Sequence, residues 1–296
     1  MKHAIDINLV NEIKRYAIMA LASEDNLMQR LVLKGGNAID LAYNRSGNTS
    51  RTSFDLDYSI EGDDDDIEDL KTTIENVLSQ TFIEKGYIIN EFKFESKPHT
   101  IKDPIVASFW GGHKIGFKVI KESLHEKYKG DKKAISRNSI ALKDNSSTVF
   151  DIEISKYEYT GHKQITDIDE LKLYVYSREM IVFEKLRALC QQMPMYSSIV
   201  PDFSPRSRAR DFYDIFYILD GYNIDMESEE NKTILKHVFD AKKVPLDYIK
   251  ELRNHKSIHA DNWNSVTNTV SNTTKIEDFD FYFNFVLDKF ENIIFP

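Results

Sequence analysis

Apolar residues near the start of the chain recur every four positions, which places them on one face of a helix. They are Ile5, Leu9, Ile13, Ala17 and Leu21. This spacing predicts one or two amphipathic helices over residues 5–30. A short apolar run at 31–33 then indicates a buried strand, and we expect the helices to cover the sheet to which it belongs.

Two motifs follow this strand. They are Lys34-Gly35-Gly36 and Arg51-x-Ser53-x-Asp55-x-Asp57. The eighteen residues between Gly36 and Asp55 suffice for a helix over 37–43, a polar turn over 44–48 and the start of a second strand. The pattern therefore predicts a strand-helix-strand unit with one motif at each end of the helix.

A helix and several strands are expected in the rest of the first half. The helix covers 67–84, and β-rich composition predicts strands over 87–95, 105–110, 114–120 and 148–155. Gly111-Gly112 has the spacing of a hairpin turn between two of these strands. The aspartate run at 63–66 could attract a metal ion, but carboxylates favour helix N-termini, so we interpret it as a solvated helix cap.

Helical periodicity dominates from residue 177 onward. The predicted helices cover 177–193, 207–220, 228–240, 246–254, 261–272 and 278–293. The sequence thus predicts an α+β fold: a mixed-sheet domain over 1–176 and a helical domain over 177–296. Residues 193–205, which include three prolines, form the expected mobile connection.

Composition is that of an ordinary globular protein. Of the 296 residues, 41% are hydrophobic and 29% are charged. The single cysteine, Cys190, has no disulfide partner, which fits a reducing compartment. No apolar run approaches the ~20 residues that a membrane helix needs. We therefore expect a cytoplasmic protein that does not bind membranes.

The net charge of −9 is unevenly distributed. Residues 51–95 contain 13 acidic and 4 basic residues, whereas residues 97–143 contain 11 basic and 4 acidic ones. A polyanion could dock on the second stretch despite the acidic total. The alternative is a solvated basic surface that balances its acidic neighbour, since no nucleic-acid-binding motif is present.

Asp55 and Asp57 lie two positions apart on the predicted second strand, so both carboxylates face one side of the sheet. Together they can hold Mg²⁺, or Mn²⁺ as the alternative, through oxygen ligands. Gly35 and Gly36 would leave bare backbone amides at a helix N-terminus, where a triphosphate can approach closely. The two motifs predict a metal-dependent site for a nucleoside triphosphate.

A second pair of carboxylates stands on the strand predicted over 148–155. Asp151 and Glu153 share one face, and metal sites of this kind usually need a third carboxylate from a neighbouring strand. Asp151 is slightly preferred as the metal ligand because its side chain is shorter. The alternative is an ordinary edge strand with a polar face.

Two helical segments add cations. Lys185 stands on an otherwise apolar helix, so its ammonium must either reach solvent or meet an anion. The next helix opens with Arg206, Arg208, Arg210 and Asp211; the arginines could clamp phosphates, and the aspartate could accept a proton. Taken alone, each segment favours a salt-bridged helix surface over a phosphate-binding role.

With these motifs in this order, residues 30–220 resemble the AbiEii/AbiGii family of nucleotidyltransferase toxins. The matching segments are Lys34-Gly35-Gly36, Arg51-x-Ser53-x-Asp55-x-Asp57, Glu184-Lys185-Leu186 and Arg208-x-Arg210-Asp211-x-x-Asp214. The resemblance implies a polymerase-β-like nucleotidyltransferase core followed by a helical domain. It also implies a toxin of a toxin-antitoxin or phage-defence pair, with a cognate antitoxin, that transfers NMP from NTP to the 3′ end of tRNA and stops translation.

The resemblance also implies roles for individual residues. Asp55 and Asp57 would hold Mg²⁺, Lys185 would bind a nucleotide phosphate, and Asp211 would complete the catalytic set. The residues that would contact the nucleotide are Lys34, Gly35, Gly36, Ser53, Lys185, Arg208 and Arg210. Two positions depart from the family: Arg210 replaces a lysine, which keeps the charge but changes the hydrogen-bond geometry, and Asn37 replaces a small residue.

Two alternatives to RNA modification stay open at the level of sequence. The acceptor could be a protein or a small molecule, because only the basic stretch over 97–143 favours RNA. The chain could also be a non-catalytic binding module derived from a transferase. Asp55, Asp57 and Lys185 argue against the second alternative, since a binding module has no chemical need for two metal-binding carboxylates.

Overall fold

The computed structural model describes residues 6–44, 51–62, 66–143, 147–201, 203–270 and 275–293. In these residues the strands form one seven-stranded sheet in the order β3-β4-β5-β2-β1-β7-β6. The strands are β1 (Leu31–Lys34), β2 (Leu56–Ile60), β3 (Tyr87–Lys97), β4 (Gly112–Lys121), β5 (Val149–Ser155), β6 (Gln164–Ile168) and β7 (Leu171–Val175). Parallel and antiparallel neighbours both occur, so the predicted mixed sheet is confirmed.

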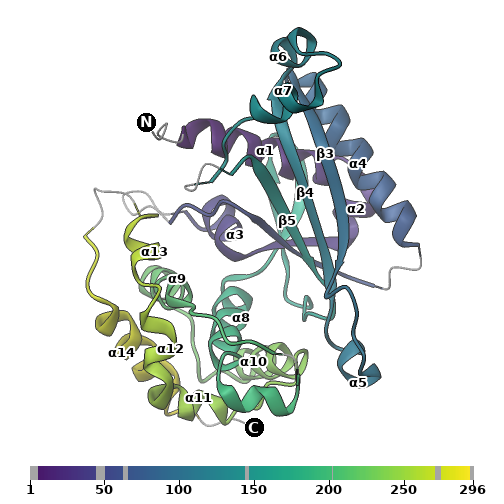
Figure 1. Cartoon of the computed structure of the whole chain (residues 1–296). Coiled ribbons are helices and arrows are strands. Elements are labelled where there is room, and N and C mark those ends of the chain that lie inside the picture. Colours follow the sequence, from purple (N-terminus) through teal and green to yellow (C-terminus); the bar gives the residue numbers. More distant parts are fainter. Residues whose placement is uncertain are drawn as a thin grey trace.

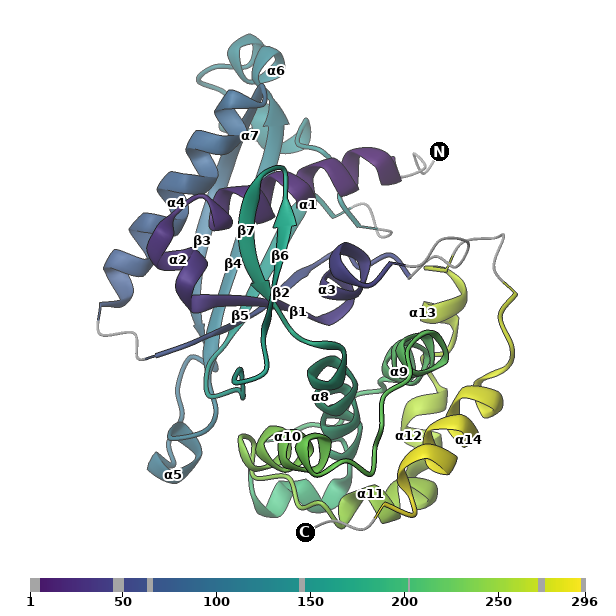
Figure 2. The same ribbon diagram turned by 180° about the vertical axis from the view of Figure 1, so that it is seen from behind.

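Three amphipathic helices cover one face of the sheet (Figures 1 and 2). They are α1 (Ile7–Ala22), α2 (Asp25–Arg30) and α4 (Ile67–Glu84), close to the predicted ranges. Side-chain oxygens of Asp6 and Asp66 accept backbone N–H groups and cap α1 and α4. The capping interpretation is therefore confirmed for Asp66, whereas residues 63–65 lie outside the described residues.

The arrangement of β2, β4 and β5 brings the acidic positions onto one face of the sheet. Strand β4 alternates buried and half-buried residues, as a strand with one covered face should. Strand β5 lies between β4 and β2, so the alternative of an edge strand is wrong. Because β2 and β5 run parallel with Asp57 opposite Glu153, these two side chains lie on the same face.

The prediction of a strand over 105–110 is wrong. Pro104–Ala107 form the short helix α5, which begins after the capping residue Asp103 with proline in its first turn. Gly111-Gly112 is consequently not a hairpin turn, because the whole segment 98–111 separates β3 from β4. Strand composition at 105–110 was overridden by local capping chemistry.

The hairpin of β6 and β7 was not predicted. Its turn residues Asp169 and Glu170 both have positive φ, the backbone form of a tight hairpin turn. Neither glycine nor asparagine occupies the turn, so the usual sequence signal is missing. The hairpin extends the sheet beyond β1 and leads directly into the second half of the chain.

Helices make up the second half, as predicted. Its helices are α8 (Arg178–Cys190), η1 (Pro194–Ser198), α9 (Ala209–Gly221), α10 (Glu229–Asp240), α11 (Tyr248–Glu251), η2 (Leu252–His255), α12 (Lys256–Ala260), α13 (Asn264–Thr267) and α14 (Phe279–Phe290). The first half also contains α3 (Gly35–Ala42), α6 (Glu122–Lys127) and α7 (Lys132–Arg137). The long helix predicted over 261–272 is wrong in its described part, where α13 spans a single turn. The helix predicted over 246–254 is divided into α11 and η2.

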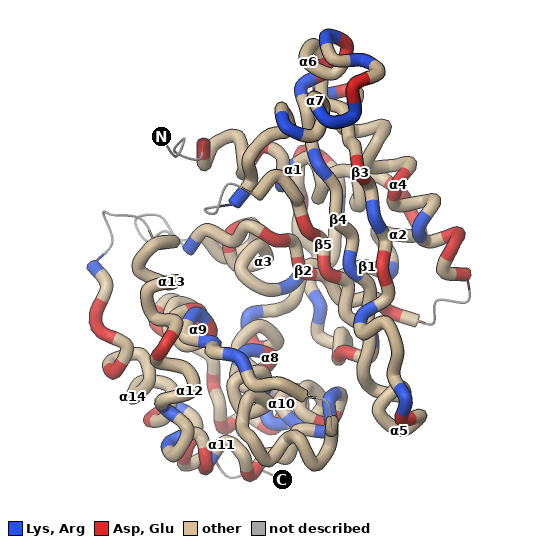
Figure 3. Tube along the Cα trace, viewed as in Figure 1, with Lys and Arg blue, Asp and Glu red and all other residues tan. Residues whose placement is uncertain are grey.

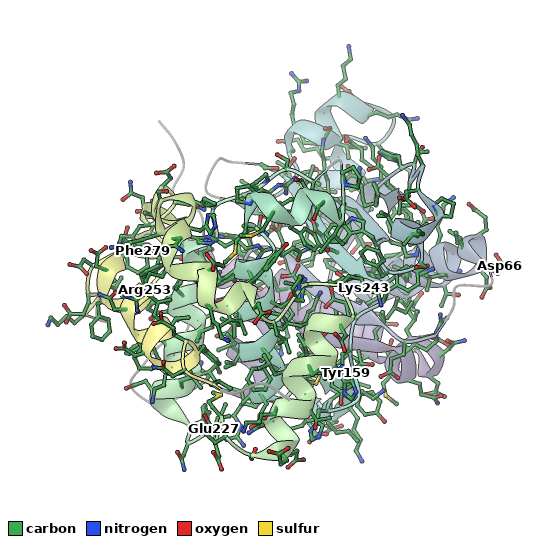
Figure 4. All side chains as sticks on the ribbon, turned by 90° about the horizontal axis from the view of Figure 1, so that it is seen from below. Asp66, Tyr159, Glu227, Lys243, Arg253 and Phe279 are labelled. Atoms are coloured by element: carbon green, nitrogen blue, oxygen red, sulfur yellow. The ribbon has the colours of Figure 1, made fainter. Side chains whose placement is uncertain are left out.

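One apolar core runs through both halves. The same cluster contains Val10 of α1, Phe150 of β5 and Phe290 of α14. The molecule is broad nonetheless: Asp66 at the start of α4 and Phe279 at the start of α14 lie on opposite sides (Figure 4). The predicted domain boundary at 176–177 falls between β7 and α8, and the division into two domains stays a prediction.

The described part of the expected mobile connection over 193–205 packs on this core. Tyr196 is fully buried and its hydroxyl donates to the backbone oxygen of Lys242 at 2.7 Å. None of the helices in the described parts of the chain is long and apolar enough to cross a membrane.

Candidate active site

The Gly-Gly turn and the acidic motif lie against each other. Gly35 has φ +68° and opens α3, and a Cβ added to it would lie 2.9 Å from Oδ2 of Asp57. A Cβ on Gly36 would lie 3.0 Å from Cβ of Ser53. Both glycines are therefore required by the close approach of the two segments, and the N-terminus of α3 faces the acidic strand.

Buried polar contacts fix the loop that carries Ser53 and Asp55. The ammonium of Lys14 donates to the backbone oxygen of Ser53 at 2.9 Å and to Oδ1 of Asn37 at 3.3 Å. Asn37 in turn donates to the backbone oxygen of Asp55 at 2.6 Å. Asn37, which departs from the family pattern, thus positions the acidic loop from α3.

Asp57 is the more buried of the two predicted metal ligands. Burial raises the pKa of its carboxyl to about 6, the charge of Lys34 opposes this rise, and Glu153 and Asp55 add to it. Several negative groups thus share a poorly solvated space. A divalent cation would relieve their repulsion, which is the electrostatic requirement of a metal site.

The third candidate ligand, Asp151, lies within the same group. Its Oδ2 is 2.5 Å from Nζ of Lys143, and the same ammonium is 2.6 Å from Oδ1 of Asp55. Nζ of Lys114 is 3.3 Å from Oδ1 of Asp151 and 3.7 Å from Oε1 of Glu153. Lysine ammoniums therefore neutralise the carboxylates that were expected to hold metal.

The donor chemistry of the site fits Mg²⁺. Asp55, Asp57 and Asp151 offer carboxylate oxygens from neighbouring segments, and hard divalent cations prefer such ligands. Oδ1 of Asp55 is buried and makes no hydrogen bond of good geometry with any described residue, despite its ion pair with Lys143. As the described side chains lie, however, no three Asp, Glu, His or Cys groups are close enough to hold a metal ion.

The second half of the site is a buried charge network that joins α8 and α9 to the acidic motif. Lys185 is 3.0 Å from Asp211 and 2.7 Å from Asp214, so its ammonium meets two anions instead of reaching solvent. Arg51 forms two hydrogen bonds with Asp214, at 2.9 and 2.8 Å. Arg208 is 2.8 Å from Asp211.

The network fixes the protonation states of its members. Burial alone would raise the pKa of Asp211, but Lys185 and Arg208 hold it well below its usual range. Burial opposes the charge of Lys185, but Asp211 and Asp214 hold the pKa of that ammonium above its usual range. Asp211 is therefore a weak base, and its geometry suits orienting Lys185 better than accepting a proton.

Lys34 and Arg210 point to other partners. Nζ of Lys34 is 3.0 Å from Oγ of Ser155 and 3.4 Å from Oε2 of Glu158, inside a buried cluster. The guanidinium of Arg210 donates to Oγ of Ser265 at the start of α13. The structure thus brings most of the predicted residues together in one site. Lys34 and Arg210 lie at the edge of this site, where they make structural contacts.

Three residues of the site were not among the predicted site residues. Arg51 and Asp214 belong to the matched motifs, and their charges alone could have suggested a pair across 163 residues. Lys143 belongs to no sequence motif. Its position beside the carboxylates depends on the path that the chain takes after α7. Only the structure brings it to the carboxylates.

The chain was compared with known proteins. The family model described as nucleotidyl transferase AbiEii toxin, type IV TA system, matches residues 17–285. A search of curated proteins gave no match. The family match extends over most of the chain and includes all the site residues described above except Lys14.

Among solved structures, a putative nucleotidyltransferase from H. pylori is similar, with 15% identity, a TM-score of 0.48 and 97% of each chain covered. JHP933 from Helicobacter pylori has 18% identity and a TM-score of 0.45, with 97% of this chain and 95% of that one covered. An antigenic nucleotidyltransferase-like protein from Paracoccidioides brasiliensis has 16% identity and a TM-score of 0.38, with 81% and 94% covered.

Proposed function

Because the chain belongs to the AbiEii family of nucleotidyltransferase toxins of type IV toxin-antitoxin systems, we propose that it transfers a nucleoside monophosphate from a nucleoside triphosphate to RNA. The proposed acceptor is the 3′ end of tRNA, whose modification would stop translation. A cognate antitoxin is the proposed protein partner. The contact of Gly35 and Gly36 with the Asp57 and Ser53 segment carries this proposal.

The α3 N-terminus supports binding of the triphosphate. Free amides at this end of the helix can donate to phosphate oxygens, and the missing side chains of Gly35 and Gly36 leave the approach open. Lys185 of α8 and Arg208 at the start of α9 add positive charge to the site. These cations would stabilise the charge that develops as pyrophosphate leaves.

The reaction requires in-line displacement at the α-phosphorus. The acceptor hydroxyl oxygen forms a bond to phosphorus, the bond to the β-phosphate oxygen breaks, and pyrophosphate departs. Mg²⁺ held by Asp55, Asp57 and Asp151 would supply charge neutralisation at the phosphates. Lys185, oriented by Asp211 and Asp214, would hold one phosphate in line.

The hydroxyl proton needs an acceptor, and Glu153 suits this role best. Asp211 is a weak base, and Asp151 is paired with two lysines. The side chain of Glu153 is 56% exposed and only loosely paired with Lys114 at 3.7 Å. It lies opposite Asp57 on the parallel strand, within the same group of carboxylates.

An exposed basic surface supports RNA as the acceptor. Helices α6 and α7 lie at the end of the sheet remote from the helical half (Figure 3), and four lysines of these helices and of the turn between them are exposed. They are Lys127, Lys129, Lys132 and Lys133. From α7 the chain returns to the site, where Lys143 contacts Asp55 and Asp151. RNA bound at this surface would have to extend along this segment to reach the carboxylates.

The test is incubation of the protein with each labelled triphosphate, Mg²⁺ and total RNA, followed by separation of the products. We expect one class of RNA to acquire label. Asp55→Ala and Asp57→Ala should reduce labelling by about 10²-fold or more and leave the thermal melt nearly unchanged, because loss of either carboxylate also lowers the repulsion within this group of negative charges. Asp288→Ala, at an exposed position of α14, is the matched control.

Two outcomes would contradict the proposal. Near-wild-type labelling by a folded Asp55→Ala protein would overturn the metal site. Label recovered in protein or in a small molecule, with RNA unlabelled, would replace RNA as the acceptor and leave the nucleotidyl transfer intact. Either result can be interpreted only when the exposed control variant Asp288→Ala labels RNA as the wild type does.

A further inference from the structure

Lys143 bridges the two halves of the carboxylate group. Its ammonium is 2.6 Å from Oδ1 of Asp55 and 2.5 Å from Oδ2 of Asp151. These two residues come from different segments, the loop before β2 and the middle of β5. No sequence motif marks Lys143, and the proposed transfer reaction does not use it.

The backbone holds Lys143 in this position. The preceding residue, Leu142, is fully buried in the core, and its N–H donates to the backbone oxygen of Ser147 at 2.8 Å. Just before it, the N–H of Ile140 donates to the backbone oxygen of Val119 on β4 at 2.8 Å. The lysine stem therefore starts from a fixed point beside β4 and β5, and only its side chain is free to withdraw.

The contacts of Lys143 have the geometry of a cation position. An ammonium 2.5 to 2.6 Å from two carboxylate oxygens stands only slightly farther from them than Mg²⁺, whose oxygen ligands lie at about 2.0–2.1 Å. One ammonium and one metal ion cannot both occupy this space. Lys114 differs, because it approaches Asp151 and Glu153 from the β4 side and does not contact Asp55.

We propose that Lys143 is a tethered cation that occupies the metal position in the metal-free enzyme, keeps Asp55 and Asp151 together, and withdraws when a divalent cation binds. It is thus a positioning residue for the site and a competitor of the metal. The proposal rests on the metal site of the proposed function. It predicts that Asp55 and Asp151 stay together without metal and that the metal binds more weakly than the carboxylates alone would allow.

Mn²⁺ binding in the absence of nucleotide tests the proposal directly. Free Mn²⁺ is measured by electron paramagnetic resonance during titration of the wild-type protein and of Lys143→Met, which keeps the length of the stem. If the bridged form makes up about nine-tenths of the metal-free molecules, its loss should lower the apparent Kd for Mn²⁺ about tenfold.

Two matched variants separate competition from loss of charge. Lys114→Met removes a positive charge from Asp151 without removing the bridge, so we expect about twofold tighter binding or less, as for a screened charge. Lys163→Met removes a lysine of similar exposure from an ion pair with Glu61 outside the site and should leave Mn²⁺ binding unchanged.

Each other outcome overturns the inference. Equal Kd values for wild type and Lys143→Met exclude competition, and equal gains from Lys143→Met and Lys114→Met reduce the effect to general charge. Weaker binding by Lys143→Met would mean that the lysine supports the metal ligands. Absence of Mn²⁺ binding in both wild type and Lys143→Met would overturn the metal site itself, and RNA labelling in the presence of a chelator would then show whether transfer survives.

Discussion

The buried ammonium of Lys185 depends on the carboxylates that surround it. Lys185 is only 3% exposed, and two carboxylates satisfy it. The same surroundings make it sensitive to replacement, because removing one partner from a buried ion pair leaves the other charge uncompensated. Sequence could place Lys185 on an apolar helix, but not name the partners that hold it.

We expect Lys185→Ala to lower both activity and stability. Loss of the ammonium should reduce transfer about 10²- to 10³-fold and lower the free energy of unfolding by about 3–5 kcal/mol, because Asp211 and Asp214 stay buried without it. Lys172→Ala, at an exposed position of β7, should change neither. Steady-state kinetics and thermal melts of both variants measure the two effects.

Lys185→Arg separates these contributions. It keeps the charge and should restore most of the stability, but the broader guanidinium cannot reproduce the position of the ammonium, so transfer should stay well below wild type. A folded Lys185→Arg or Lys185→Ala protein with kinetics like those of Lys172→Ala would show that Lys185 serves the fold alone.

His259 makes the protein sensitive to acid. Its ring is fully buried against Phe212, and neither ring nitrogen has a hydrogen-bond partner among the described residues. Burial lowers the pKa of His259 to about 4; Asp211 opposes this shift, while Arg208 and His255 add to it. The unfolded chain, with a pKa near 6.5, therefore binds the proton first as pH falls.

We expect this residue to cost stability between pH 6.5 and 4. The loss should reach about 1–3 kcal/mol at the acid end of that window and vanish above pH 7. His259→Leu, which fills the site without a titrating group, should flatten the dependence of the unfolding free energy on pH. His237→Gln, at an exposed position of α10, is the control; equal pH slopes for wild type and His259→Leu would assign the effect to other groups.

At the scale of elements, strongly periodic or capped segments followed the sequence closely, and short ones did not. The helix α4 begins and ends at the predicted residues 67 and 84 because an aspartate cap and four regularly spaced apolar residues specify it. The β6-β7 hairpin and the single turns α12 and α13 depend on tertiary contacts. Neither their composition nor their length distinguishes them from loops.

The lysines of α6 and α7 give a prediction at this scale. Neutralising Lys127, Lys129, Lys132 and Lys133 together should weaken RNA binding and transfer, because each phosphate contact releases counterions. The slope of log affinity against log salt should become shallower by about 0.7–0.9 for each contact that is lost. Triphosphate binding at α3 should not change, since α3 lies away from the tip that α6 and α7 form (Figure 3).

A second fourfold variant controls for total charge. Lys236, Lys243, Lys250 and Lys289 are exposed on the helical half. Their neutralisation should leave the salt dependence unaltered. If both variants modify RNA alike, the docking surface is elsewhere, and the arginines at the start of α9 become the next candidates.

At the scale of the whole molecule, the site unites parts of the chain that sequence reasoning treated as separate domains. The acidic motif and the Gly-Gly turn could be predicted as one unit because one helix joins them. Their union with α8 and α9 was implied only by a family resemblance. Two contacts join the acidic motif to the helical half. The guanidinium of Arg51 donates a hydrogen bond to the carboxylate of Asp214, and the N–H of Thr52 donates to the backbone oxygen of Thr269.

The ion pair of Arg51 and Asp214 can form only late in the synthesis of the chain on the ribosome. Its members are 163 residues apart, and ribosomes add about 5–20 residues per second, so the acidic motif waits on the order of ten seconds for its partner helix. A nascent chain therefore lacks this ion pair through most of its own synthesis. Under the proposed function, the chain would gain the ability to arrest translation only once its own translation has passed α9.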